Sequence, residues 1–121
     1  MTIIRYLVND IESSIAFYTK HLGFELTQQM GPAFAIVSKG DLDLWLSGPQ
    51  TSAAKPMPNG SQPVAGGWNR FVIEVENIEA LVASMKNAGV LFRNEIITGP
   101  GGKQILAEDP SGNPIEIFQS A

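Results

Sequence analysis

The chain has 121 residues, a net charge of −4 and no cysteine. Its length suits one compact domain, and its 44% hydrophobic content excludes a disordered chain. The acidic balance without a basic stripe argues against nucleic-acid binding, and no apolar run is long enough to cross a membrane. Since cysteine is absent and the N-terminus lacks a signal-peptide layout, we expect a cytoplasmic protein without disulfides.

The first part of the sequence predicts a strand, a helix and three further strands. Residues 3–9 alternate between two faces as a strand does. Asp10 is a predicted helix N-cap, and Gly23 is placed to end that helix. The helix carries an apolar stripe of Ile11, Ile15, Tyr18 and Leu22. Three strand candidates then follow at 24–29, 34–38 and 42–47.

Residues 48–67 form a connecting segment dominated by glycine, proline, serine and alanine. Such a composition is typical of a linker. Long ordered loops in small domains are also often functional, so the segment is either a plain linker or a lid over a binding site.

The second part of the sequence repeats the first. A strand at 70–76 precedes Asn77, which is a predicted N-cap, and Gly89 is placed to end the helix. The stripe of this helix is Ile78, Leu81, Val82 and Met85. Strand material follows at 90–97, 104–108 and 114–119, with a loop at 99–102 and a turn at 109–113.

This repetition predicts one α+β domain spanning residues 1–121. Its parts are repeat one at 1–47, the connecting loop at 48–67 and repeat two at 68–121. Each repeat has the order βαβββ, so we expect a curved mixed sheet with both helices on its outer face. The opposite faces of the two half-sheets can then form a cup, which is a usual place for a small-molecule site.

Several short motifs within this pattern point to a known family. The first repeat carries Val8-Asn9-Asp10-Ile11, Ser14-Ile15-Ala16-Phe17-Tyr18 and Leu22-Gly23-Phe24. The second carries Val75-Glu76-Asn77-Ile78, Asp109-Pro110-Ser111-Gly112-Asn113 and Ile115-Glu116-Ile117. Together they resemble the vicinal oxygen chelate superfamily, which includes glyoxalase I, extradiol dioxygenases, fosfomycin-resistance thiol transferases, methylmalonyl-CoA epimerase and bleomycin-binding proteins. The resemblance implies the fold, while one fold hosts many chemistries.

The resemblance also implies where a metal would bind in metal-dependent members. The two histidine positions of the family fall on Ile3 and Arg70, and the last-strand glutamate is Glu116. The corresponding strand of the first repeat offers Asp43 or Trp45. The only histidine, His21, lies at the end of a helix, where we expect a surface role.

This ligand set is poor, so we expect no metal cofactor. An all-oxygen magnesium or manganese site from Asp43, Glu74 and Glu116 is the alternative, with Glu116 as its main candidate. Arg70 beside Glu116 argues against such a site, because a guanidinium repels a cation.

Arg70 is instead expected to supply the positive charge of a ligand site, with Arg5 pointing into the same cup. Flat apolar walls would come from aromatic side chains and specificity from polar ones. The candidate ligand-binding residues are Arg5, Asp43, Trp45, Trp68, Arg70, Glu74, Gln104 and Phe118. The alternative is that Arg70 and Glu116 form a structural ion pair in a cup without a ligand.

Three classes of function therefore stay open. The favoured one is a metal-independent protein that binds a small anionic or aromatic molecule. The second is a lyase, isomerase or thiol transferase of the same superfamily, with Glu116 as general base and Arg70 stabilising an anion. The third is an interaction module with a filled cup. The resemblance implies a homodimer. A metal site completed across the two chains would make a metal-dependent enzyme possible despite the poor ligand set of one chain.

Overall fold

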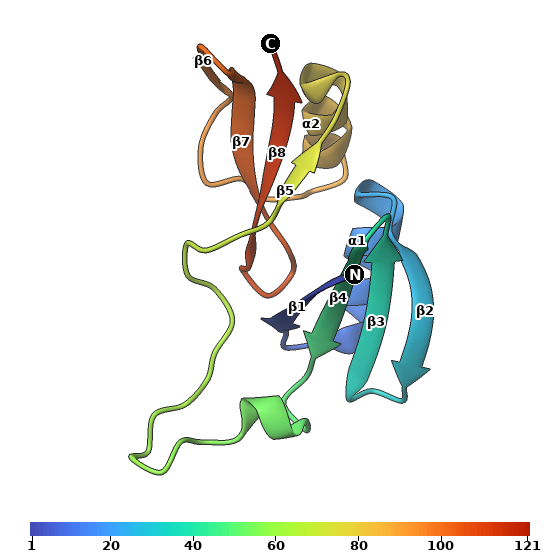
Figure 1. Ribbon diagram of the computed structural model, residues 1–121, viewed down its shortest axis with the longest axis vertical. Helices are drawn as coiled ribbons and strands as arrows, with labels where there is room; N and C mark the ends of the chain where they lie inside the picture. The colour runs from blue at the N-terminus through green and yellow to red at the C-terminus, as the bar shows by residue number, and fades with distance from the viewer.

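The computed structural model describes residues 1–121 and contains two four-stranded sheets, each with one helix (Figure 1). The first sheet has the strand order β1-β4-β3-β2; β1 runs parallel to β4, and the other pairs are antiparallel. Its elements are β1 (Thr2–Leu7), α1 (Ile11–His21), β2 (Glu25–Met30), β3 (Phe34–Lys39) and β4 (Leu42–Ser47).

The second sheet repeats this topology with the order β5-β8-β7-β6, in which β5 runs parallel to β8. Its elements are β5 (Val72–Glu74), α2 (Ile78–Asn87), β6 (Ile97–Gly99), β7 (Gly102–Glu108) and β8 (Pro114–Ser120). The connection between the sheets is a long loop that contains one short 3-10 helix, η1 (Ser52–Ala54) (Figure 1). The predicted α+β fold of two βαβββ repeats is therefore confirmed.

Both helices begin and end where the sequence predicts. The Asp10 side chain accepts a hydrogen bond from the Ser13 amide at 2.8 Å, and the Asn77 side chain accepts one from the Ala80 amide at 3.0 Å. Gly23 and Gly89 follow the helices with φ of +73° and +90°, a conformation that favours glycine.

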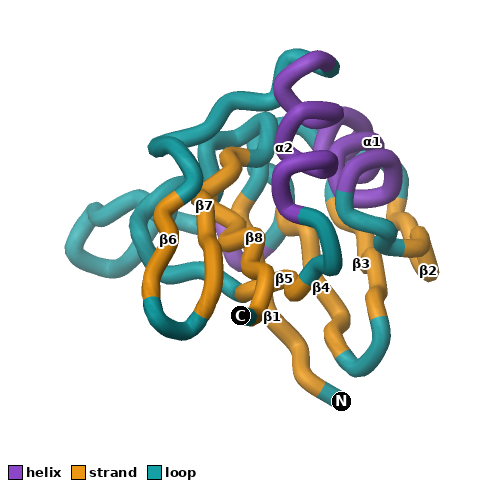
Figure 2. The backbone as a smooth tube through the Cα atoms, turned by 90° about the horizontal axis from the view of Figure 1, so that it is seen from above, coloured by secondary structure: helices purple, strands orange, loops and turns teal.

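The core lies between each sheet and its helix, and both helices are on the same side of the strands (Figure 2). Alternate strand residues face the helices and are fully buried, including Leu44 and Leu46 of β4 and Ile115 and Ile117 of β8. The intervening residues face the other way, and this open face of each sheet carries the candidate site residues. Neither helix is long and apolar enough to span a membrane.

The segment 90–97 differs from the prediction, because only Ile97 belongs to a regular strand. Phe92 makes an isolated bridge to Ala107, and the Asn94 side chain, instead of a backbone carbonyl, accepts a hydrogen bond from the Leu106 amide at 3.0 Å. Because a side chain takes the place of a backbone carbonyl here, the backbone hydrogen-bond ladder is interrupted and β6 begins only at Ile97. The strand predicted at 70–76 is also shorter and spans β5 alone.

The turn at 109–113, expected to serve turn geometry alone, also joins the two repeats. We call this turn the module clasp. Asp109 Oδ2 accepts a hydrogen bond from the Tyr18 hydroxyl at 2.7 Å, and Asn113 Nδ2 donates to the Leu7 carbonyl at 2.7 Å. Beside the clasp, the Tyr6 hydroxyl donates to the Pro114 carbonyl at 2.7 Å. These bonds connect residues more than ninety positions apart and fix the repeats against each other.

Candidate functional site

The first sheet presents a cationic and aromatic cluster on its open face. The Arg5 guanidinium lies 5.1 Å from the centroid of the Trp45 ring, and its Nη1 donates to Ser47 Oγ at 3.0 Å. Phe34 meets the Trp45 ring edge-on at 5.8 Å. We call Arg5, Phe34, Trp45 and Ser47 the first-sheet cluster. It brings together two of the predicted ligand-binding residues, Arg5 and Trp45.

Asp43 lies on the same face of the first sheet, two residues before Trp45 on β4. Its Oδ1 accepts a hydrogen bond from Ser38 Oγ at 2.7 Å, so a neighbouring strand holds this carboxylate in place. Ile3, at a family histidine position, is opposite Asp43 in the strand register and is 48% exposed. An apolar side chain therefore stands where a metal ligand would be needed.

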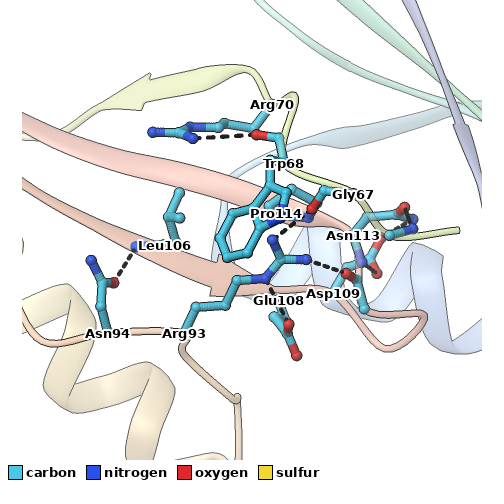
Figure 3. A network of polar contacts seen from close by, with 12 residues as sticks. Gly67, Trp68, Arg70, Arg93, Asn94, Leu106, Glu108, Asp109, Asn113 and Pro114 are labelled. Atoms are coloured by element: carbon cyan, nitrogen blue, oxygen red, sulfur yellow. Dashed lines mark hydrogen bonds and ion pairs between the residues drawn. The ribbon is translucent and has the colours of Figure 1, made fainter.

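The second sheet carries the predicted Arg70–Glu116 pair (Figure 3 shows Arg70). Arg70 Nη2 and Nε donate to Glu116 Oε1 at 2.8 and 3.1 Å, and Nη1 donates to the Trp68 carbonyl at 3.2 Å. Both bonds to the carboxylate fall on one oxygen, and Oε2 accepts no hydrogen bond within the protein. The Glu116 side chain is 12% exposed, against 30% for Arg70. Glu116 Oε2 thus keeps a hydrogen-bonding capacity that the protein itself does not use.

Arg93 is a central residue of this region that sequence reasoning missed. Its guanidinium lies 4.5 Å from the centroid of the Trp68 ring, and its Nε donates to Glu108 Oε2 at 2.8 Å. Its two terminal nitrogens donate to the carbonyls of Gly67 and Gly112 at 2.6 and 2.9 Å (Figure 3). Arg93 therefore ties the end of the connecting segment to the module clasp and supports the exposed ring of Trp68. Nothing in the sequence links these distant partners.

The other predicted residues lie on the same open face. Glu74 accepts a hydrogen bond from Ser120 Oγ at 2.9 Å. Gln104 and Phe118 are cross-strand partners on β7 and β8, and Phe118 is also opposite Glu74 in the register. We call Trp68, Arg70, Glu74, Gln104, Arg93, Glu116 and Phe118 the second-sheet cluster.

Apart from Asp43, which is on the first sheet but outside its cluster, the predicted site residues are divided between two clusters, one on each sheet. No hydrogen bond, ion pair or aromatic contact joins the first-sheet cluster to the second-sheet cluster. The edge strands β1 and β5 face each other across a groove of about 490 Å³, which residues of both strands line. A single chain thus presents two separate clusters of candidate residues, one on each sheet.

The donor set does not fit a metal ion. No three histidine, aspartate or glutamate side chains come together in a way that could hold a metal. Glu116, the main candidate, already shares one oxygen with the Arg70 guanidinium. A cation beside this arginine would meet direct charge repulsion.

Comparisons with known proteins agree with this architecture. A curated relative, the bleomycin resistance protein of Geobacillus stearothermophilus, is 29% identical over 119 residues, covering 93% of this chain and 90% of the relative. The crystal structure of TnmS3, an antibiotic-binding protein from Streptomyces sp. CB03234, matches with a TM-score of 0.73 at 24% identity over 98% and 93% of the two chains. Lactoylglutathione lyase from Agrobacterium tumefaciens matches with a TM-score of 0.76 at 18% identity over 98% and 92%.

Two βαβββ repeats with paired open sheet faces define the glyoxalase-like class of α+β proteins. The family model of the Glyoxalase/Bleomycin resistance protein/Dioxygenase superfamily matches residues 2–117. The chain belongs to this superfamily, as the motifs of its two repeats indicate.

Proposed function

We propose that this protein binds a small aromatic or anionic molecule on its open sheet faces, without a bound metal. The observation that carries this proposal is an arginine placed over an aromatic ring in each half: Arg5 over the half-buried Trp45, and Arg93 over the exposed Trp68. A flat ring backed by a fixed cation offers both an apolar wall and a charge to a ligand.

The relatives support a binding role. One curated relative is a bleomycin resistance protein, and one structural neighbour is an antibiotic-binding protein. The first-sheet cluster has no general base among its four residues, so it suits recognition rather than chemistry. An antibiotic-like molecule with an aromatic portion is therefore the ligand class that we favour.

We also propose that the protein is a homodimer in which each half-site is completed by the other copy. Apolar side chains remain uncovered on the open faces, with Ile3 48% and Val72 52% exposed. Apolar surface of this kind marks an interaction site, and a two-fold axis would place the second sheet of one copy over the first sheet of the other. Light scattering should give twice the mass of one chain. The cytoplasmic location expected from the sequence remains a prediction.

The binding proposal predicts that bleomycin, as a probe, binds saturably and that Trp45→Ala raises its Kd about ten-fold or more. The reason is the loss of the flat wall on which Arg5 stacks; large aromatic side chains commonly dominate binding energy. Isothermal titration calorimetry measures the Kd. Asn87→Ala, at an exposed position of α2 on the helix side, is the control and should leave the Kd unchanged.

The alternative is a lyase, isomerase or thiol transferase. The observation that favours it is Glu116 Oε2, which accepts no hydrogen bond within the protein and could act as a proton acceptor. Chelator-treated protein should then be unfolded thermally with zinc, nickel, manganese or magnesium. A saturable stabilisation that Glu116→Ala removes would contradict the metal-free proposal and favour the enzyme.

Equal bleomycin affinity in Trp45→Ala and the parent protein would instead contradict the proposed location of the site.

A further inference from the structure

A second hollow lies beside the helices of the molecule. It has a volume of about 610 Å³ and lies between α1, the segment that follows α2, and the module clasp. Its lining includes Phe17, Lys20, His21, Val90, Glu108 and Asp109. None of the ligand-binding residues predicted from the sequence is among them. Its volume falls within the range of about 300–1,000 Å³ that is usual for small-molecule sites.

The hollow combines an apolar wall with a lysine and a histidine. Phe17 and Val90 contribute apolar surface, and the Leu91 side chain is 69% exposed at the rim. Lys20 and His21 come from the last turn of α1, where the negative end of the helix dipole attracts cations. The His21 ring contacts Phe17 edge-on at 5.6 Å. Neither Lys20 nor His21 makes an ion pair or a side-chain hydrogen bond in the structure.

The carboxylates of the lining are already engaged within the protein. Glu108 Oε2 is paired with Arg93 Nε at 2.8 Å. Both oxygens of Asp109 accept hydrogen bonds, from Tyr18 and from the Asn113 side chain and backbone among others. The charged side chain of the hollow that remains without a partner is therefore Lys20, with the His21 imidazole beside it as a polar group.

We propose that this hollow is a second binding site, which takes a small monoanion with an aromatic body. The apolar wall would accept the ring, and Lys20 and His21 would face its charged group at the rim. This inference does not rest on the ligand proposed for the sheet faces, because none of the residues predicted to bind that ligand lines the hollow. The two regions meet at Glu108 and Gly112, which line the hollow and accept hydrogen bonds from Arg93 of the second-sheet cluster. The site adjoins the module clasp, so its occupant would contact both repeats at once.

The test uses naphthalene-1-sulfonate as the probe and backbone amide NMR shifts of the whole protein as the readout. We expect saturable shifts at Ala16, Gly89 and Gly112, which lie on three different sides of the hollow. The neutral analogue 1-naphthalenemethanol should bind more weakly, because it lacks the charge that Lys20 and His21 would meet.

Three variants separate this site from the sheet faces. Lys20→Gln and His21→Gln should each raise the Kd about two- to five-fold, as expected for the loss of one exposed charged or hydrogen-bonded contact. Ala16→Trp should abolish the shifts by filling the hollow, with circular dichroism to show that the variant folds. Trp45→Ala, on the opposite side of the first sheet, should leave the Kd for the probe unchanged.

The proposal is overturned if the saturable shifts fall on the sheet faces alone or do not occur. It is also overturned if the neutral analogue binds as tightly as the sulfonate and both glutamine variants keep the parent affinity. Because the glutamine variants change only the side chains at the rim, they decide the question even if Ala16→Trp does not fold.

Discussion

Asp109→Ala is expected to lower the free energy of unfolding by about 3–5 kcal/mol, the scale on which removing one partner destabilises a buried charged network. Asp109 is 4% exposed and its carboxylate accepts four hydrogen bonds. Two come from the Tyr18 hydroxyl and Asn113 Nδ2, and two from the amides of Ser111 and Asn113. Alanine would leave these donors buried without an acceptor, which costs more than the bonds themselves contribute.

Urea unfolding followed by circular dichroism measures this loss. Asp41→Ala is the matched control, because Asp41 is an exposed aspartate in the turn between β3 and β4 and its side chain makes no hydrogen bond. Its free energy of unfolding should change by less than about 0.5 kcal/mol. Equal stability of the two variants would show that the module clasp does not hold the repeats together.

The protein is also expected to lose stability steeply as the pH rises above about 10. Burial raises the pKa of Tyr6 to about 12. Burial, reinforced by the negative charge of Asp109, raises the pKa of Tyr18 well above its ordinary value. An unfolded chain releases these phenolic protons near pH 10, whereas the folded chain keeps them. Above pH 10 the folded chain therefore holds more protons than the unfolded chain. The contribution of the two tyrosines to the free energy of unfolding is fully present below pH 10 and is lost as the pH rises toward 12.

Each tyrosine with a raised pKa lowers the free energy of unfolding by about 1.4 kcal/mol per pH unit in this window. Both hydroxyls donate hydrogen bonds between the repeats, Tyr6 to Pro114 and Tyr18 to Asp109, so their ionisation would part the repeats. Urea unfolding at pH 8, 9.5, 10.5 and 11.5 gives the slope. Tyr6→Phe and Tyr18→Phe should each flatten it above pH 10, because phenylalanine does not titrate. An unchanged slope in both variants would assign the alkaline loss to other groups.

The candidate site could be predicted from the sequence only where strand alternation places residues on one face. Arg5 and Trp45 share the open face of the first sheet, and Arg70 lies beside Glu116, as strand parity and the family motifs indicated. Their roles in binding remain predictions. Arg93 was missed because its partners, Gly67 and Gly112, come from a loop and a turn far from it in the chain.

The distribution of the site residues was also beyond sequence reasoning. Periodicity predicts which face a side chain occupies, but it does not say how two sheets sit relative to each other. The structure separates the first-sheet cluster from the second-sheet cluster, and it opens the helix-side hollow where α1 meets the segment after α2. His21, expected simply at the surface, lines that hollow.

The sequence by itself determined the two repeats, their helix ends and the apolar faces of their strands. These depend on local chemistry: a capping side chain, a glycine with positive φ, and alternation along a strand. Tertiary structure decided the interrupted strand at 90–97, the hydrogen bond from Tyr18 to Asp109 and the position of Arg93. Each of these contacts joins residues that are not neighbours in the chain, so tertiary packing decides the pairing.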